Sequence, residues 1–363
     1  MIKHKDHFHG SDLEEIEKVY GIKKENIISF SGNVNPLGIS PLLKRTLTEK
    51  IDAISVYPDR DYHSLRKCIA EYTGTEIGNI IVGNGTTELI SLFIKIEQPK
   101  KAMILGPTYS EYEREISLGN GAAHYYPLQE KEDFLLDVED FTQHLDESID
   151  LLVICNPNNP TSSAISSAQM RLILDVCKQL DIFVMVDETY VEFTENYESL
   201  TAIPLTNFYN NIIILRGTSK FFAAPGLRLG YAITGNRDLI EQINTRKNPW
   251  TINSLAAIAG ELMFTDYEYM EQTRELINSE RNRLLAFFKQ RSDYRAFPAK
   301  ANFLLLKILR DDLTSHDLFE RCIREGMMIR DCSTFPFLNQ KFIRFCILNP
   351  DENNKLLEIL TKW

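Results

Sequence analysis

The feature that most constrains the fold is an alternation, from about residue 79 to 235, of short apolar runs with longer amphipathic stretches. The runs are rich in β-branched residues and are bounded by turn-forming residues, which is typical of strands buried on both faces of a mostly parallel sheet. Met170–Leu180 has helical spacing and is expected to be a crossover helix. The expected strands are Asn79–Gly83, Ala102–Leu105, Leu151–Cys155, Ile182–Val186, Ile212–Leu215 and Tyr231–Thr234.

The C-terminal third has a different pattern. From about Asn253 to Arg291 it predicts a long helix, followed by a strand at Asn302–Ile308, a helix, and strands around Met327–Arg330 and Phe342–Leu348. We therefore expect an α/β fold with three parts: an N-terminal arm (residues 1–40) that joins the small domain, a large domain (41–255), and a small α+β domain (256–363).

Charge and composition narrow the function classes. With 40 Lys and Arg against 51 Asp and Glu, the formal net charge of −11 argues against nucleic acid or an anionic membrane as a partner. No apolar run approaches the roughly 18–20 residues of a spanning helix, and no secretory leader opens the chain, so a cytoplasmic location is expected. No metal site is expected, and buried free thiols are the favoured interpretation of Cys68, Cys155, Cys177, Cys322, Cys332 and Cys346.

The most informative segment for chemistry is Arg216–Phe221 with Pro225–Tyr231 after it. Lys220 follows an apolar strand, and Arg228 lies eight residues later in a turn bounded by glycines. A desolvated lysine beside other cations becomes a nucleophile, so Lys220 could hold an aldehyde cofactor while Ser219 and Arg228 bind its phosphate. A solvated surface loop explains this segment about equally well.

Three more turns follow predicted strands. Asn156–Thr161 is a rigid polar turn at a position where α/β sheets place ligands, although Asn-Pro turns are common. Asp187 ends another strand and could pair with a pyridinium nitrogen, although a helix N-cap is the likelier role for that residue alone. The glycine-bounded turn Gly83–Glu88 is suited to a phosphate, and alone it is weak evidence.

Together these four segments resemble the class I/II aminotransferase family, the fold-type I pyridoxal-phosphate enzymes, over nearly the whole chain. The resemblance implies pyridoxal 5'-phosphate as cofactor and a homodimer with shared active sites. It makes Lys220 the Schiff-base lysine and proton shuttle, and pairs Asp187 with the pyridine nitrogen. Its other implied cofactor contacts are hydrogen bonds to the ring O3′ from Tyr190 and Asn159, stacking by Tyr109, phosphate binding by Gly85, Thr86, Ser219 and Arg228, and contact with that phosphate by Tyr57 of a second subunit.

Within the family the chain resembles two branches that act on small phosphorylated amino compounds. Phe30–Gly38, Asn248–Asn253 and Ile329–Ser333 resemble L-threonine-O-3-phosphate decarboxylases of cobalamin synthesis. Tyr109 and Tyr190 resemble the pattern of histidinol-phosphate aminotransferases more closely, so both branches stay open. The substrate-binding residues that the resemblance implies are Asn35, Arg330, Arg344 and His9.

Three positions depart from the family pattern. Ser162 stands where glycine is usual, a change that we expect the turn to tolerate. Gly217 replaces a phosphate-binding serine or threonine, so Thr218 compensates or one contact is absent. Phe337 replaces a glycine, which puts the shape of the substrate loop in question.

Overall fold

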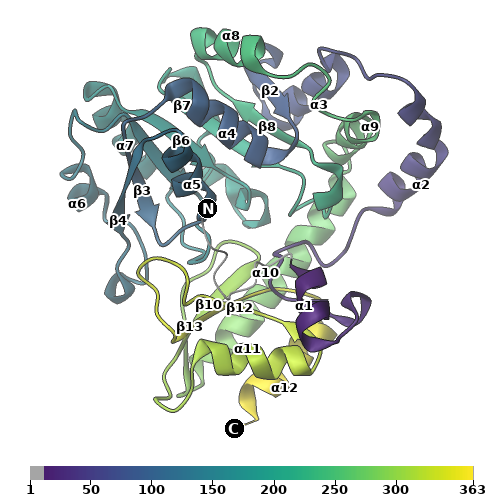
Figure 1. Cartoon of the computed structure of the whole chain (residues 1–363), viewed down its shortest axis with the longest axis vertical. Coiled ribbons are helices and arrows are strands. Elements are labelled where there is room, and N and C mark those ends of the chain that lie inside the picture. Colours follow the sequence, from purple (N-terminus) through teal and green to yellow (C-terminus); the bar gives the residue numbers. More distant parts are fainter. Residues whose placement is uncertain (1–11, 363) are drawn as a thin grey trace.

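The computed structural model describes residues 12–362, and its largest element is a seven-stranded sheet (Figure 1). Across this sheet the strands follow the order β2 (Ile80–Gly83), β8 (Gly230–Ile233), β7 (Ile212–Gly217), β6 (Phe183–Asp187), β5 (Leu151–Cys155), β3 (Lys101–Gly106) and β4 (Ala122–Pro127). Strand β8 is antiparallel to β2 and β7, and the other neighbours are parallel. The predicted α/β class with a mostly parallel sheet is confirmed.

Every strand predicted for this sheet is present, within two residues at either end. Strands β2, β5, β7 and β8 are buried along their whole length, which explains why their sequences are continuous apolar runs. Strand β4 was not predicted. It lies at the sheet edge, its residues are exposed or only partly buried, and its sequence therefore lacks a long apolar run.

Helices cover both faces of the large sheet. One face packs against α4 (Gly85–Glu97), α5 (Glu111–Leu118) and α8 (Arg237–Arg246). The other packs against α3 (His63–Thr73), α6 (Val138–Thr142), α7 (Ser167–Gln179) and α9 (Ser254–Met263), and α2 (Pro41–Glu49) lies against α9. Helix α7 is the predicted crossover helix, and it begins at a capping box formed by Ser166 and Gln169.

The single long helix predicted over Asn253–Arg291 is wrong. The structure has two helices, α9 and α10 (Tyr267–Lys289), separated at Phe264–Asp266. The side chain of Asp266 accepts a hydrogen bond from the backbone N–H of Tyr269, so it caps a new helix where the apolar periodicity seemed continuous.

A second, antiparallel sheet lies below the first in Figure 1. Its order is β12 (Arg330–Asp331), β13 (Phe342–Cys346), β10 (Phe303–Ile308) and β9 (Tyr294–Ala296), with α11 (Ser315–Arg324) and α12 (Pro350–Thr361) beside it. Near the N-terminus, α1 (Leu13–Tyr20) precedes β1 (Ile28–Ser29), which pairs in parallel with β11 (Met327–Met328). The domain boundaries at residues 40/41 and 255/256 stay predictions.

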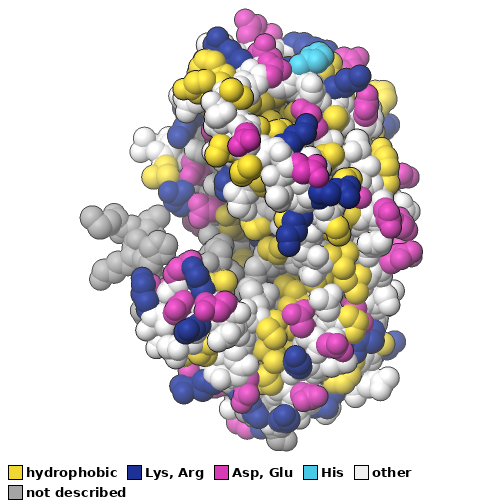
Figure 2. Space-filling view, turned by 90° about the vertical axis from the view of Figure 1, so that its right-hand side faces the viewer, with side chains coloured by type: hydrophobic (Ala, Val, Ile, Leu, Met, Phe, Trp, Pro, Cys, Tyr) yellow, Lys and Arg dark blue, Asp and Glu magenta, His cyan; other side chains and the backbone are white. Residues whose placement is uncertain are grey.

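The surface and the thiols add two observations. Acidic and basic side chains are interspersed over the face shown in Figure 2. Within residues 12–362, no helix has both the length and the apolar character that crossing a membrane requires. All six cysteines are free thiols, and five are buried, whereas Cys68 is partly exposed.

Candidate active site

The sequence motifs meet at the carboxyl edge of the parallel strands. Gly106–Tyr109 follows β3, the Asn156–Thr161 turn follows β5, and Asp187 ends β6. Lys220 lies three residues after β7. Because β3, β5, β6 and β7 are parallel and adjacent, these four segments lie at one edge of the sheet.

Lys220 is partly buried, not fully solvated as in the alternative of an open surface loop. Its Nζ donates a hydrogen bond to the carbonyl of Gly32 at 2.7 Å. Burial, together with the positive charges of Arg344 and Arg228, lowers the pKa of Lys220 to about 8. The amine is therefore available in neutral, nucleophilic form near physiological pH.

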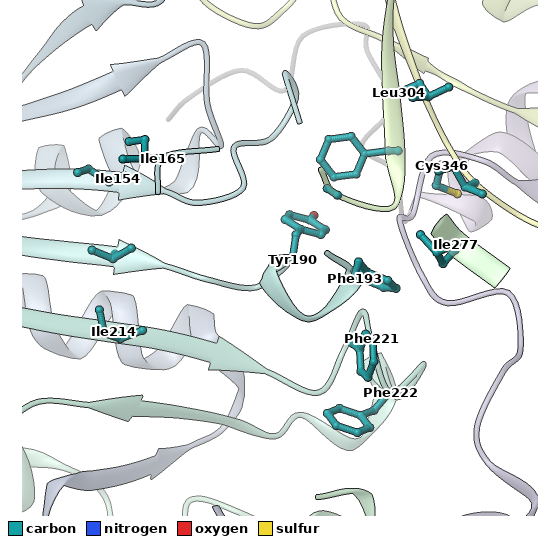
Figure 3. Packing of buried hydrophobic residues seen from close by; sticks show 14 of the residues in the cluster. Ile154, Ile165, Tyr190, Phe193, Ile214, Phe221, Phe222, Ile277, Leu304 and Cys346 are labelled. Atoms are coloured by element: carbon teal, nitrogen blue, oxygen red, sulfur yellow. The ribbon is translucent and has the colours of Figure 1, made fainter. Parts of the chain in front are cut away.

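Aromatic packing fixes the segment that carries Lys220. Figure 3 shows Phe221 and Phe222 on this segment beside Phe193, which follows β6. The ring centroids of Phe193 and Phe221 lie 5.1 Å apart, and so do those of Phe221 and Phe222. From α10, the guanidinium of Arg281 donates to the carbonyl of Phe193 at 3.2 Å. The segments after β6 and β7 are thus tied to each other and to α10.

Asp187 is a buried carboxylate without a cation. Its Oδ1 accepts from the backbone N–H of Thr189 at 2.9 Å and from the Thr189 hydroxyl at 2.5 Å, while its Oδ2 accepts from the Tyr112 hydroxyl at 2.7 Å. No α-helix begins at Asp187, so the N-cap alternative is wrong. No Lys, Arg or His side chain within residues 12–362 forms an ion pair with Asp187. Burial raises its pKa, and the hydrogen bonds from Thr189 and Tyr112 oppose that rise.

The turn between β2 and α4 forms a cradle with Arg228. Gly85 begins α4 with a φ of +80°, and a Cβ there would lie 2.4 Å from Arg228 Nη2. A Cβ on Gly230 would lie 2.6 Å from the backbone N of Thr86, so glycine is required at this close approach as well. A guanidinium against the N-terminus of a helix provides two positive groups for an anion such as phosphate.

Gly217 fits the same close packing. A Cβ at Gly217 would lie 3.1 Å from Cγ2 of Thr86, so a larger residue would press on the turn that begins α4. Thr218 does not replace a phosphate contact here, because its hydroxyl donates to the carbonyl of Leu229 at 3.2 Å.

Tyr109, Tyr190 and Asn159 surround these groups. Burial raises the pKa of Tyr109 to about 12, and burial raises the pKa of Tyr190 as well. The Tyr190 hydroxyl accepts a hydrogen bond from Asn33 Nδ2 at 3.3 Å. Asn159 Oδ1 accepts a hydrogen bond from Arg344 Nη1.

Arg344 lies in β13 and is buried, with its Nη2 donating to the carbonyl of Ser31 at 2.8 Å. Its Nε has no hydrogen-bond partner among the described residues. Within residues 12–362, three more of the nine buried side-chain atoms without a partner belong to nearby residues that are linked by hydrogen bonds: Ser31 Oγ, Asn33 Oδ1 and Asn302 Oδ1. Buried polar groups are rarely left unpaired in proteins, so this concentration marks a place where a polar ligand fits.

The predicted substrate contact of Asn35 finds no support in the geometry. The two N–H groups of its Nδ2 are shared among the carbonyl of Phe221 and the hydroxyls of Tyr269 and Thr273, at 2.7–2.9 Å, and its Oδ1 accepts from Leu37 N. Both ends of the amide are thus engaged within the protein, and two of its partners lie on α10. Asn33, which the sequence analysis missed, is the asparagine that reaches Tyr190, and its φ of +55° turns the chain there.

Arg330 lies directly opposite Arg344 in the β12–β13 pair. Its guanidinium donates to the Thr334 hydroxyl at 3.1 Å and lies 5.3 Å from the ring centroid of Phe335. Burial lowers the pKa of Arg330, and the charge of Arg344 adds to that effect. Arg330 and Arg344 are like charges opposite each other in a strand pair, and the carboxylates of Asp331 and Asp12 offset part of the effect of Arg344 on Arg330.

Two predicted residues lie away from this cluster or beyond the described chain. Tyr57 is 81% exposed, and its ring lies 5.1 Å from that of Trp250. Within one copy of the chain it is therefore not part of the buried site. His9 lies outside the described residues.

The two remaining departures have distinct structural consequences. Ser162 adopts a φ of +59°, the left-handed region that favours glycine. Its hydroxyl accepts from the backbone N–H groups of Lys300 and Ala301 at 3.1 and 2.8 Å, which ties the turn after β5 to the segment before β10. Phe337 has a φ of +65° and packs against Tyr125 and Gly106, so its ring covers the end of β3.

The residues present fit pyridoxal phosphate. Asp187 lacks a cation that a pyridinium would supply, Lys220 is a desolvated amine, and the Gly85–Arg228 cradle suits a phosphate. Throughout residues 12–362, no group of three or more His, Cys, Asp or Glu side chains could hold a metal ion.

The topology and this combination of groups define a fold-type I pyridoxal-phosphate enzyme. The chain belongs to the family described as aminotransferase class I and II, which matches residues 25–360. The predicted family and its pyridoxal phosphate cofactor are thereby confirmed.

Individual relatives include both predicted branches. A protein of Caldanaerobacter subterraneus subsp. tengcongensis, provisionally named as a threonine-phosphate decarboxylase, is 38% identical over 90% of this chain and 88% of its own. The threonine-phosphate decarboxylase of Salmonella typhimurium is 32% identical over 97% of this chain and 95% of its own. The solved structure of histidinol-phosphate aminotransferase from Clostridium acetobutylicum has 31% identity and a TM-score of 0.85, and the match covers 91% of this chain and 97% of that one.

Proposed function

We propose that this chain is a pyridoxal-phosphate-dependent L-threonine-O-3-phosphate decarboxylase. The proposal makes it an enzyme of cobalamin synthesis. The observation that carries an anionic amino substrate is the pairing of Arg330 and Arg344 beside the unpartnered atoms at Ser31, Asn33 and Asn302. Threonine phosphate has two anionic groups and one hydroxyl-derived ester oxygen, which suits two guanidiniums and a set of neutral polar groups.

The choice of decarboxylation is supported by the relatives. The proteins named as threonine-phosphate decarboxylases match at 38% and 32% identity over nine tenths or more of this chain. The two arginines do not decide between the reactions, because histidinol phosphate is also an anion.

Bound pyridoxal phosphate would withdraw electrons from whichever bond at the substrate Cα stands perpendicular to its ring. Asp187 would pair with the ring nitrogen, and Arg228 with the N-terminus of α4 would hold the phosphate. Tyr109 would stack on the ring, while Tyr190 and Asn159 would bind its O3′. Thr86 and Ser219 would add further hydrogen bonds to the phosphate.

The reacting bond would be selected by the substrate-binding arginines. Arg344 and Arg330 would bind the anionic groups of the substrate and so decide whether its carboxylate or its Cα–H is presented for bond breaking. Lys220 Nζ would deliver a proton to Cα after loss of carbon dioxide, or would accept the Cα proton in amino transfer. The same set of cofactor contacts therefore serves both reactions, and the orientation of the substrate decides between them.

We also infer that a second copy of the chain completes the site. Ile51, Ile54 and Val56 are between 49% and 66% exposed, and with Tyr57 and Trp250 they form an apolar surface beside α9. A contiguous exposed apolar surface marks a site of association. A homodimer formed here would bring Tyr57 of each copy toward the cofactor phosphate of the other.

Histidinol-phosphate aminotransferase is the second candidate. The Clostridium acetobutylicum structure, at 31% identity and a TM-score of 0.85, supports it. The tyrosines at positions 109 and 190 also resemble that branch.

Substrate preference separates the two candidates. We would compare kcat/KM for carbon dioxide release from L-threonine O-3-phosphate with kcat/KM for amino transfer from histidinol phosphate to 2-oxoglutarate. L-Threonine without its phosphate serves as the matched control for the anion. We expect threonine phosphate to be preferred over both. Turnover of histidinol phosphate alone would contradict the proposal.

A further inference from the structure

We propose that Tyr112 is a positioning residue that, with Thr189, leaves the carboxylate of Asp187 one free acceptor position directed to the cofactor ring nitrogen. This inference rests on the proposed pairing of Asp187 with that nitrogen and extends it to a residue to which no role has been given. Tyr112 is not predicted to touch the cofactor. It would act through Asp187.

The argument begins with a count of acceptor positions. A carboxylate offers about four lone-pair positions, two on each oxygen. Thr189 fills both positions on Asp187 Oδ1, through its backbone N–H at 2.9 Å and its hydroxyl at 2.5 Å. The Tyr112 hydroxyl fills one position on Oδ2 at 2.7 Å. One position on Oδ2 is left for one further donor.

The surroundings show that this further donor should be a cation. Asp187 and Tyr112 are both buried, and a buried carboxylate is costly unless it is paired. Residues 12–362 supply no Lys or Arg ion-paired with Asp187. The hydrogen bonds from Thr189 and Tyr112 lower the pKa of Asp187 against the effect of burial, so they favour the ionised form that a pyridinium requires.

The position of Tyr112 in the chain argues for a role beyond packing. It lies in the first turn of α5, three residues after Tyr109, and the two rings are 5.6 Å apart in an edge-to-face contact at 85°. Tyr109 lies in the loop that leads into α5, two residues before the helix begins. One short segment therefore supplies both the ring predicted to stack on the cofactor and the hydroxyl that fixes Asp187.

A phenylalanine at position 112 would retain the ring and the apolar contacts of this fully buried side chain. The hydroxyl group is therefore the part of Tyr112 that the proposal concerns. If the hydroxyl only needed Asp187 as its own hydrogen-bond partner, its loss would change the stability of the protein and leave recognition of the ring nitrogen unchanged.

The experiment measures recognition of that nitrogen directly. The apoprotein would be titrated with pyridoxal 5'-phosphate and with its 1-deaza analogue, in which a C–H group replaces the ring nitrogen, and the ratio of the two Kd values would be determined. We expect Tyr112→Phe to reduce the preference for pyridoxal phosphate by about tenfold, since hydrogen bonds to charged groups are the stronger ones. The melting temperature of each apoprotein would be recorded as a separate measure of stability.

The control is Tyr209→Phe, which removes a similar hydrogen bond from a tyrosine to an aspartate, Tyr209 to Asp175 at 2.6 Å, distant from the motifs of the site. It should leave the Kd ratio unchanged. Thr189→Val removes the hydroxyl donor to Oδ1 and should also reduce the ratio, so the proposal can be tested even if Tyr112→Phe does not fold.

Asp187→Asn separates the inference from the proposed function. A loss of the preference in Asp187→Asn together with a reduction in Tyr112→Phe supports both. A loss in Asp187→Asn with a wild-type ratio in Tyr112→Phe and Thr189→Val overturns the role of Tyr112 alone, whatever happens to the melting temperature. A wild-type ratio in Asp187→Asn overturns the pairing of Asp187 with the ring nitrogen, and the inference with it.

Discussion

The cofactor side and the substrate side of the site differ in how completely their polar groups are bonded. At Asp187, three hydrogen bonds from Thr189 and Tyr112 fix the carboxylate. Along residues 31–33 and at Arg344, by contrast, buried polar atoms lack partners in the part of the chain that the structure describes. The difference indicates that the protein alone holds the cofactor-facing groups in place, whereas the substrate-facing groups are completed by what binds there.

The largest expected effect comes from the one group that both sides need. Replacing Lys220 by Ala should abolish the visible absorbance band of the bound cofactor and nearly all activity, because it removes the amine that would hold the cofactor. Lys101→Ala is the control, since that lysine lies at the opposite end of β3 and bonds to Ser148. Retention of both the band and the activity in Lys220→Ala would refute the site assignment.

Asp187→Ala tests the cofactor side alone. The variant should still bind pyridoxal phosphate through the cradle at Gly85 and Arg228, but turnover should fall by about 100-fold or more, because a positioned charge is removed from the reacting system. Absorbance and turnover measured on the same sample would show this split. A wild-type rate would rule out the proposed role.

Arg344→Gln tests the substrate side. The kcat/KM for threonine phosphate should fall by about 100-fold, since loss of a buried charge pairing costs about 2–5 kcal/mol. Cofactor absorbance should be unchanged. Arg330→Gln should have a smaller effect, about tenfold. Arg291→Gln, which breaks a pair with Asp293 elsewhere in the chain, is the control. Equal kcat/KM values for Arg344→Gln and this control would contradict the account.

Asn33 and Asn35 sharpen the comparison between binding and stability. Asn33→Ala should lower kcat/KM by about tenfold with little change in melting temperature. Asn35→Ala should lower the free energy of unfolding by about 2–4 kcal/mol, because several buried hydrogen bonds to α10 and Phe221 are lost. Its kcat/KM, measured below the melting transition, should stay near that of the wild type. The reverse pattern would show that the two roles are exchanged.

The last prediction concerns the dependence of cofactor uptake on pH. Because the pKa of Lys220 is lowered from 10.5 to about 8, its amine is mostly protonated below pH 8 and mostly neutral above it. The rate at which the apoprotein takes up pyridoxal phosphate should therefore rise by up to tenfold per pH unit below 8, and level off above it. Stopped-flow absorbance, recorded from about pH 6 to about pH 9.5, would show whether the uptake rate reaches this plateau. A rise that continued through pH 9.5 would indicate an unperturbed lysine.

The strands of the large sheet could be predicted from the sequence because each is a buried β-branched run between turn signals. Edge strand β4 could not, since its exposed residues give no such run. The break between α9 and α10 was missed because the Asp266 cap interrupts an otherwise continuous helical pattern. Local caps of this kind are visible only as single residues.

The residues of the candidate site also fall into those that the sequence could indicate and those that it could not. Lys220, Asp187 and the Gly83–Glu88 turn each follow a predicted strand, but each alone had a structural alternative, and only their combination resembled the aminotransferase family. The choice between Asn33 and Asn35 could not be made, because the positive φ at Asn33 decides which side chain turns toward Tyr190. Tyr112 was missed because a tyrosine on a helix usually belongs to the core, and only its nearness in sequence to Tyr109 set it apart.

The most direct test of the proposed reaction is the number of turnovers in the absence of any keto acid. Cofactor-loaded enzyme would be mixed with excess L-threonine O-3-phosphate, and carbon dioxide would be counted per active site while the cofactor absorbance is followed. We predict many carbon dioxide molecules per site, with the absorbance returning to its starting value. No carbon dioxide, with the absorbance held in a changed state until 2-oxoglutarate is added, would contradict decarboxylation and identify an aminotransferase.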